Sequence, residues 1–256
     1  MTTTKTVFTI TTLAFAAMFG GGVYLFTQLN SIVKPLTEKI ATQALGVPVS
    51  IGGMNISLQE KRVIVNNIRI ANPKGFSKPH VLTISGVDVG LRDLIKDRID
   101  FNNIAVTGAQ VYLEVKEGGT NLQALKNNMP KPTAKDTSEP AEPIKVIVRK
   151  FTLKDGQLNP SVTLIGEQDL APVKLSSLVL SDIGVKENGI LAREAITQII
   201  TPLIKSVSKD AGSAGFFEGL SADALKDMGM EQIEGLKGTI NDEVNKIGDR
   251  FKGMFQ

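Results

Sequence analysis

The stretch Val65-Asn-Asn-Ile68-Arg-Ile70 decides the fold, because its pattern of apolar and polar residues occurs four times in the chain. Each copy has an apolar residue, two polar residues, an apolar residue, one free position and a last apolar residue. The other copies are Phe101-Asn-Asn-Ile104-Ala-Val106, Val148-Arg-Lys-Phe151-Thr-Leu153 and Leu175-Ser-Ser-Leu178-Val-Leu180. Residues two apart share one face of a β-strand, so the polar pair moves the apolar residues to the other face.

A β-bulge at each polar pair would restore a single apolar face and would bend the strand. Similar interruptions occur at Ser85-Gly86 and at Thr107-Gly108-Ala109, where glycine suits a bulge. The pattern therefore predicts a curved, mostly antiparallel sheet with one concave apolar face. The alternative is that each interruption is a turn between short strands of a sandwich.

An uncharged segment of twenty residues precedes this β-rich region, from Val7 to Phe26. As a helix it would be about 30 Å long, which matches the hydrocarbon thickness of a bilayer. We interpret it as a single transmembrane helix. The alternative is a cleavable signal peptide cut near Ala14-Phe15-Ala16, but hydrophobicity continues well beyond that site.

The flanks of the segment do not set its orientation, because Lys5 precedes it while Lys34 and Lys39 follow it. Small residues within it could let another helix approach closely, in a membrane-protein partner or a second copy of the chain. These residues are Ala16, Ala17, Gly20 and Gly21.

The change of hydrophobic period along the chain predicts its organisation. The predicted segments are a short tail (1–6), the transmembrane helix (7–26), a juxtamembrane amphipathic helix (27–46), a first β-rich half (47–128), a proline-rich linker (129–143), a second β-rich half (144–190) and a helical C-terminal region (191–256). Two amphipathic helices are expected in the last region, one over 196–207 and one over 233–254, each packed on the domain or on a partner.

The residues that usually carry catalysis or metal binding are scarce. Cysteine is absent, His80 is the single histidine, and no phosphate-binding loop or nucleophile elbow occurs. Asp93 and Asp97 would share a face if 91–97 is helical, but interleaved cations favour a salt-bridged turn there over a metal site. We expect no enzyme activity, no cofactor and no metal.

Nucleic acid is not an expected partner either. The net charge is only +3, tryptophan is absent, and the chain has two tyrosines. A nucleic-acid surface needs clustered cations and usually stacking aromatic residues.

The order of these parts resembles the AsmA-like family of inner-membrane-anchored envelope proteins. The resemblance is strongest over about 1–125, where a membrane helix is followed by Ala44-Leu45-Gly46-Val47-Pro48-Val49-Ser50-Ile51, Asn72-Pro73-Lys74-Gly75-Phe76 and Gly119-Thr120-Asn121-Leu122. Phe151-Thr-Leu-Lys-Asp-Gly156 and Leu178-Val-Leu-Ser-Asp-Ile-Gly184 resemble the second half of short members. The chain is much shorter than the large members, which speaks against a continuous lipid conduit.

The resemblance implies a bacterial inner-membrane protein with one span, most of it in the periplasm, that binds or helps transfer a phospholipid in envelope biogenesis. The alternative is a non-catalytic accessory subunit of a larger membrane complex. The candidates for lining an apolar β-groove are Ile68, Ile70, Val87, Val89, Ile104, Val106, Phe151, Leu153, Leu178 and Leu180.

Overall fold

The structure is a computed structural model that describes residues 29–95, 98–116, 119–130, 145–162 and 168–216. The predicted transmembrane helix 7–26, with its small residues, and the second C-terminal helix 233–254 lie outside these residues, as does nearly all of the linker 129–143. None of the described helices is long and apolar enough to cross a membrane.

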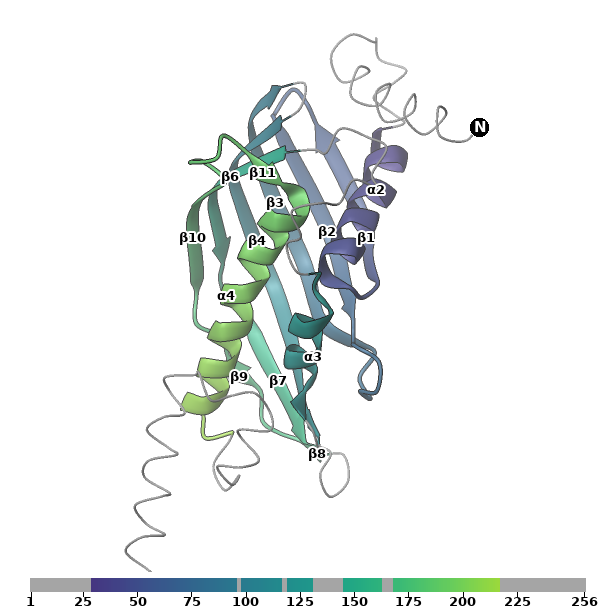
Figure 1. The fold of residues 1–256 in the computed structure, drawn as a ribbon, viewed down its shortest axis with the longest axis vertical. Coiled ribbons are helices and arrows are strands. Elements are labelled where there is room, and N and C mark those ends of the chain that lie inside the picture. Colours follow the sequence, from purple (N-terminus) through teal and green to yellow (C-terminus); the bar gives the residue numbers. More distant parts are fainter. Residues whose placement is uncertain (1–28, 96–97, 117–118, 131–144, 163–167, 217–256) are drawn as a thin grey trace, which may run out of the picture.

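A single twisted β-sheet forms the body of the protein, with the main strand order β1-β2-β3-β4-β6-β10 (Figure 1). Its long strands are β1 (Val49–Ser57), β2 (Arg62–Ala71), β3 (His80–Ile95), β4 (Arg98–Lys116), β6 (Lys145–Leu153), β7 (Gln157–Val162) and β10 (Leu178–Ile183). The two-residue strands are β5 (Gly119–Thr120), β8 (Gln168–Asp169), β9 (Val173–Lys174) and β11 (Ile190–Leu191). The pairs β4–β6 and β4–β7 are parallel, and all others are antiparallel. The prediction of a β-rich, mostly antiparallel curved sheet is confirmed.

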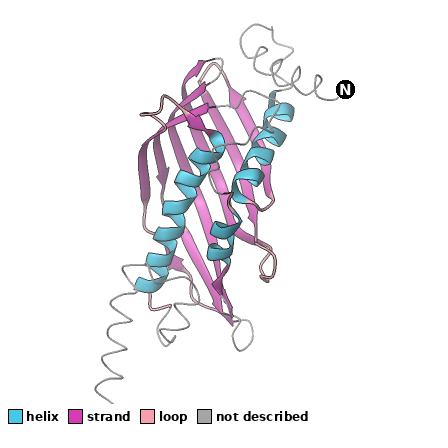
Figure 2. Cartoon of the chain, viewed as in Figure 1, coloured by secondary structure: helices cyan, strands magenta, loops and turns pink. Residues whose placement is uncertain are grey.

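In the part of the chain that the structure describes, three helices lie on one face of this sheet (Figure 2). They are α2 (Leu29–Leu45), α3 (Asn121–Asn128) and α4 (Ala192–Ser213). Helix α2 runs antiparallel to β1, because Thr42 accepts a hydrogen bond from the Val49 amide and Glu38 accepts one from the Ile51 amide. Helix α4 confirms a C-terminal helix.

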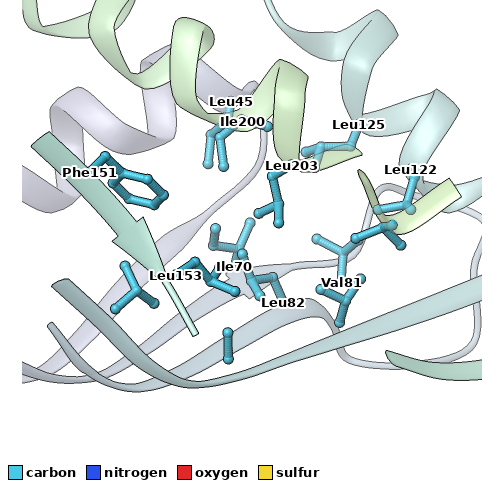
Figure 3. Close-up of a cluster of buried hydrophobic side chains, with 14 of the residues drawn as sticks. Leu45, Ile70, Val81, Leu82, Leu122, Leu125, Phe151, Leu153, Ile200 and Leu203 are labelled. Carbon is cyan, nitrogen blue, oxygen red and sulfur yellow. The ribbon is translucent and has the colours of Figure 1, made fainter. Parts of the chain in front are cut away.

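The hydrophobic core lies between the helices and the sheet (Figure 3). Leu45 of α2 and Ile200 and Leu203 of α4 point towards the sheet, where they meet Ile70 and Leu153. The helices therefore supply the apolar surface that covers the concave face.

Two transverse rows of residues explain the repeated sequence pattern. In the first crease, Gly52, Asn67, Ser85 and Gly108 stand opposite one another on β1 to β4, and the strand register is the same on both sides of them. The row continues through Asp155, between β6 and β7, and Ser176, between β9 and β10, because these strand pairs also keep one register. The second crease consists of Asn102, Arg149 and Asp182 on β4, β6 and β10.

Backbone conformation explains how the first crease moves the apolar side chains to the other face. Asn67, Gly108 and Asp155 have φ values of 54°, 62° and 52°, in the left-handed region. One such residue reverses the alternation of the side chains that follow. Because the neighbouring strands reverse at the same level, their hydrogen bonding resumes without an offset.

At the polar pairs of β2 and β6 the predicted β-bulge is therefore wrong, since a bulge places two residues against one and the register there is the same on both sides of the pair. At the polar pair of β4 the predicted bulge is confirmed: Gly90 pairs with Asn103 and Leu91 with Phe101, so Asn102 is an extra residue opposite β3. A further register shift lies between Ile70 and Ala71. The alternative of turns is also wrong for the copies at 65–70, 101–106 and 148–153, which lie within continuous strands. The fourth copy differs, because Ser176 and Ser177 lie between β9 and β10.

The segment 91–97 does not form the predicted helix where it is described, because Leu91–Ile95 continues β3. Asp93 pairs across the strands with Asp100 on β4. Among the described residues, no three histidine, cysteine or acidic side chains are grouped as metal ligands would be.

Candidate functional site

Burial increases steadily along the helix-covered side of β4. Ile99, Phe101 and Ile104 are half-buried, Val106 is 5% exposed, and Val111 and Val115 are at most 1% exposed. The half-buried part lies at the end of the sheet where α2 begins and where the β1–β2 and β3–β4 hairpins turn, which we call the hairpin end. The opposite end, next to α3 and β8, is called the closed end.

Three neighbouring strands share the half-buried surface. Val63 of β2 pairs with Val89 of β3, which pairs with Ile104 of β4, and all three are half-buried. We call these side chains, together with Ile99 and Phe101, the apolar patch. Helix α2 packs over β1, α4 packs over β6 and β10, and the two helices also pack against each other. The patch lies on β2, β3 and β4 and packs against the core.

At the closed end the apolar face is sealed by α3. Thr120 caps this helix by accepting a hydrogen bond from the Gln123 amide, which satisfies one of the free amides of the first turn. Leu122 and Leu125 then point into the core beside Val81 (Figure 3). The sequence motif 119–122 is thus a helix start that closes one end of the core.

A buried carboxylate joins the closed end to the loop after β2. Glu114 on β4 is 1% exposed and accepts hydrogen bonds from the Ser77 amide (2.7 Å), the Ser77 hydroxyl (2.7 Å), the Lys78 amide (3.0 Å) and the Asn72 side chain. Asn121 donates to Asn72 Oδ1 and accepts from the Glu114 amide. Burying a charge is costly unless donors surround it, as they do here.

The loop that holds Glu114 contains the second family motif, 72–76. Lys116 donates a hydrogen bond to the Gly75 carbonyl at 2.7 Å, and its ammonium lies 4.4 Å from the centre of the Phe76 ring. The motifs 72–76 and 119–122 are thus brought together by β4. These contacts all lie at the closed end, and none of them involves a residue of the apolar patch.

Arg149 of the second crease forms an ion pair with the buried carboxylate of Asp100. Arg149 donates two hydrogen bonds to Asp100, at 2.9 and 2.7 Å, in a bidentate arrangement. Asp100 is 5% exposed. The hydrogen bond to Asp100 raises the pKa of the Arg149 guanidinium, so the cation stays charged. The pair links β4 to β6 at the hairpin end.

The ten predicted groove residues all pack with the core on the helix-covered face. Val89 and Ile104 belong to the apolar patch. The half-buried Ile68, Leu178 and Leu180 lie outside it, and the remaining five, which are buried under the helices, are Ile70, Val87, Val106, Phe151 and Leu153. No pattern in the sequence distinguishes the two groups.

Sequence reasoning missed Ile99, Phe101 and Val63 in the patch, and it missed Glu114 altogether. Phe101 could have been found, since it opens the second copy of the repeated pattern. Glu114 offered a weaker signal: it is a charged residue between Leu113 and Val115, where a strand buried on both faces would otherwise be apolar.

The arrangement defines a class of protein: a creased β-sheet whose apolar face is lined by repeated strands and covered by the protein's own helices. The model of the AsmA family matches residues 5–197, and the chain belongs to that family. No curated protein and no solved structure matches it significantly.

Proposed function

We propose that this AsmA-family protein is a non-enzymatic, membrane-anchored periplasmic protein that binds phospholipid during envelope biogenesis. Membership of the family supports an envelope-related role. The single observation that carries lipid binding is the difference in burial along β4, which leaves apolar side chains only partly buried at the hairpin end.

The position of the patch is what makes lipid a suitable ligand. Helix α2 begins at the hairpin end, with residue 29, and the proposed transmembrane helix ends at residue 26. Three residues of extended chain span about 10 Å, so the patch would be held near the surface of the bilayer. An acyl chain leaving that surface would exchange water around Ile99, Phe101 and Ile104 for apolar contact.

Lipid retention by the full chain tests this proposal. Wild type, Ile104→Asp and Val179→Asp are purified in mild detergent, and the phospholipid that stays bound is measured by mass spectrometry. Ile104→Asp should remain folded by far-UV circular dichroism and lose most of its lipid, since a charge in the path of an acyl chain is costly to desolvate. Val179, 53% exposed on edge strand β10, is a matched control that should retain lipid.

Three outcomes of that experiment are informative. A folded Ile104→Asp protein that keeps the wild-type amount of lipid contradicts the proposal. Equal loss of lipid in both variants also contradicts it, because the effect would not belong to the patch. If Ile104→Asp unfolds and Val179→Asp does not, the result favours a closed core at residue 104.

A second candidate function is an accessory subunit of a membrane complex. The observation that favours it is the filling of most of the apolar face by α2, α3 and α4, with Ile70, Phe151 and Leu153 at most 5% exposed. In that case the helices serve as a docking scaffold. The small residues Ala16, Ala17, Gly20 and Gly21 would then contact a partner helix in the membrane.

The proposed topology has its own test. A reporter enzyme that is active only in the periplasm, fused after Gln256, should be active. The protein should stay in the membrane fraction after washing with high salt and at alkaline pH. Activity of only a cytoplasmic reporter, or a mature N-terminus near Ala17, would contradict the topology.

A further inference from the structure

We infer that the β3–β4 hairpin is a second membrane contact, which touches the surface of the same bilayer that holds the N-terminal segment. This inference rests on the proposed membrane anchoring, and it adds a surface that the lipid-binding proposal does not use. The hairpin is formed by the end of β3 and the beginning of β4, with Ile95 paired to Arg98.

The hairpin extends beyond β2 at the hairpin end of the sheet, while on its other side β4 stays paired with β6 as far as Arg98. The last pair between β2 and β3 joins Arg62 to Gly90, whereas β3 continues for five more residues, Leu91–Ile95. At about 3.3 Å per residue, this extension is roughly 16 Å long. The distance from residue 26 to the start of α2 is at most about 10 Å, so the extension is long enough to reach the bilayer surface.

The side chains of the extension suit a membrane interface. Ile95 is 40% exposed and lies next to Leu94, which is half-buried. Arg92 is exposed on the same strand, where it can meet the phosphate groups of lipids. The Asp93 carboxylate accepts a hydrogen bond from the Leu94 amide at 2.9 Å.

The exposed position of Ile95 is distinctive among the described residues. Three large hydrophobic side chains are exposed there: Ile95, Leu170 and Val179. Leu170 is 41% exposed but lies at the closed end, directly after β8, where its amide binds the Pro160 carbonyl. Ile95 and Leu170 are therefore a matched pair at opposite ends of one sheet.

Tryptophan fluorescence tests the contact directly, because the chain has no tryptophan of its own. Full-length Ile95→Trp and Leu170→Trp proteins are placed in lipid nanodiscs that contain phosphatidylglycerol, with and without brominated lipid. Bromine quenches tryptophan only at short range. We expect quenching of Trp emission in Ile95→Trp to be at least about twofold stronger than in Leu170→Trp, with a blue-shifted spectrum.

The outcomes separate this inference from the lipid-binding proposal. Equal quenching of the two variants in a protein that resists alkaline washing overturns the inference and leaves lipid binding to be decided by Ile104→Asp. Release of the protein by alkaline washing overturns the anchoring on which both rest. Stronger quenching of Ile95→Trp that persists in an Ile95→Trp/Ile104→Asp double variant supports the hairpin contact even where lipid retention is lost.

Discussion

The two ends of β4 differ in how far their apolar side chains are buried. At the closed end Val111, Leu113 and Val115 are at most 1% exposed and lie beneath α3 and α4, while Glu114 on the other face holds the loop after β2. At the hairpin end Ile99 and Phe101 are half-buried.

The difference indicates that stability and ligand access are separated along the strand. The Leu113 side chain loses nearly all contact with water on folding, whereas the Ile99 side chain keeps part of its contact with water. The first crease, with Gly108 on β4, lies between the two ends. Changes at the closed end should therefore reduce the free energy of unfolding, and changes at the hairpin end should mainly affect binding.

The largest effect on stability is expected from shortening a buried side chain at the closed end. Leu113→Ala should lower the free energy of unfolding by about 3–4 kcal/mol, because it creates a cavity under α3. Ile99→Ala, on the same face of the same strand, should cost about 1 kcal/mol. Urea unfolding of the full chain followed by circular dichroism compares them, and equal losses would mean that the two ends are equally buried.

The next effect concerns the carboxylate of the closed end. Glu114→Ala should cost about 2–3 kcal/mol, because the amides of Ser77 and Lys78 lose their acceptor. Glu60, an exposed acid in the β1–β2 turn, is the control, and Glu60→Ala should change stability by less than about 0.5 kcal/mol. The same urea series measures both. A cost for Glu114→Ala no larger than the control would show that water replaces the carboxylate freely.

The first crease forms the boundary between the two ends. Adding a side chain at its glycine on β4 should destabilise the fold more than adding one at a glycine on β1. A Cβ at Gly108 would lie 2.5 Å from Ser85 Oγ at a φ of 62°, so Gly108→Ala should cost about 2 kcal/mol. Gly53 has open space around its Cβ position, and Gly53→Ala should be neutral or slightly stabilising. Thermal unfolding ranks the two variants, and a neutral Gly108→Ala would contradict the role of backbone conformation in the first crease.

The smallest effect concerns the exposed Arg62–Asp88 pair near the hairpin end. The Arg62 hydrogen bond lowers the pKa of Asp88, so the pair stabilises the fold above the unfolded pKa of about 3.9. That contribution is lost as pH falls through the lowered pKa. Both side chains are nearly half exposed, so salt should weaken the effect. Melting temperatures between pH 5 and 2.5 should fall slightly more for wild type than for Asp88→Asn, and parallel curves would show that the pair contributes nothing.

The sequence predicted where the strands change face and did not predict how. The polar pairs at Asn66-Asn67 and Asn102-Asn103 mark the two creases, and the family resemblance is confirmed over 5–197. The β-bulge was a reasonable mechanism for one strand considered alone. It holds at Asn102 on β4. It is wrong at Asn66-Asn67 because the adjacent strands change face at the same level, as Ser85 does opposite Asn67, and a one-dimensional pattern carries no information about that alignment.

By itself, then, the sequence determined the family, the β-rich class, the positions of the creases and ten of the apolar residues on the covered face. These depend on residue order and on the two-residue period of a strand. Only the tertiary structure decided that Phe151 is sealed while Ile104 is half-exposed, and that Glu114 binds the loop at 72–78. The physical reason is that burial depends on which helix lies over a strand, and α4, which packs against β6, follows it only after five further strands.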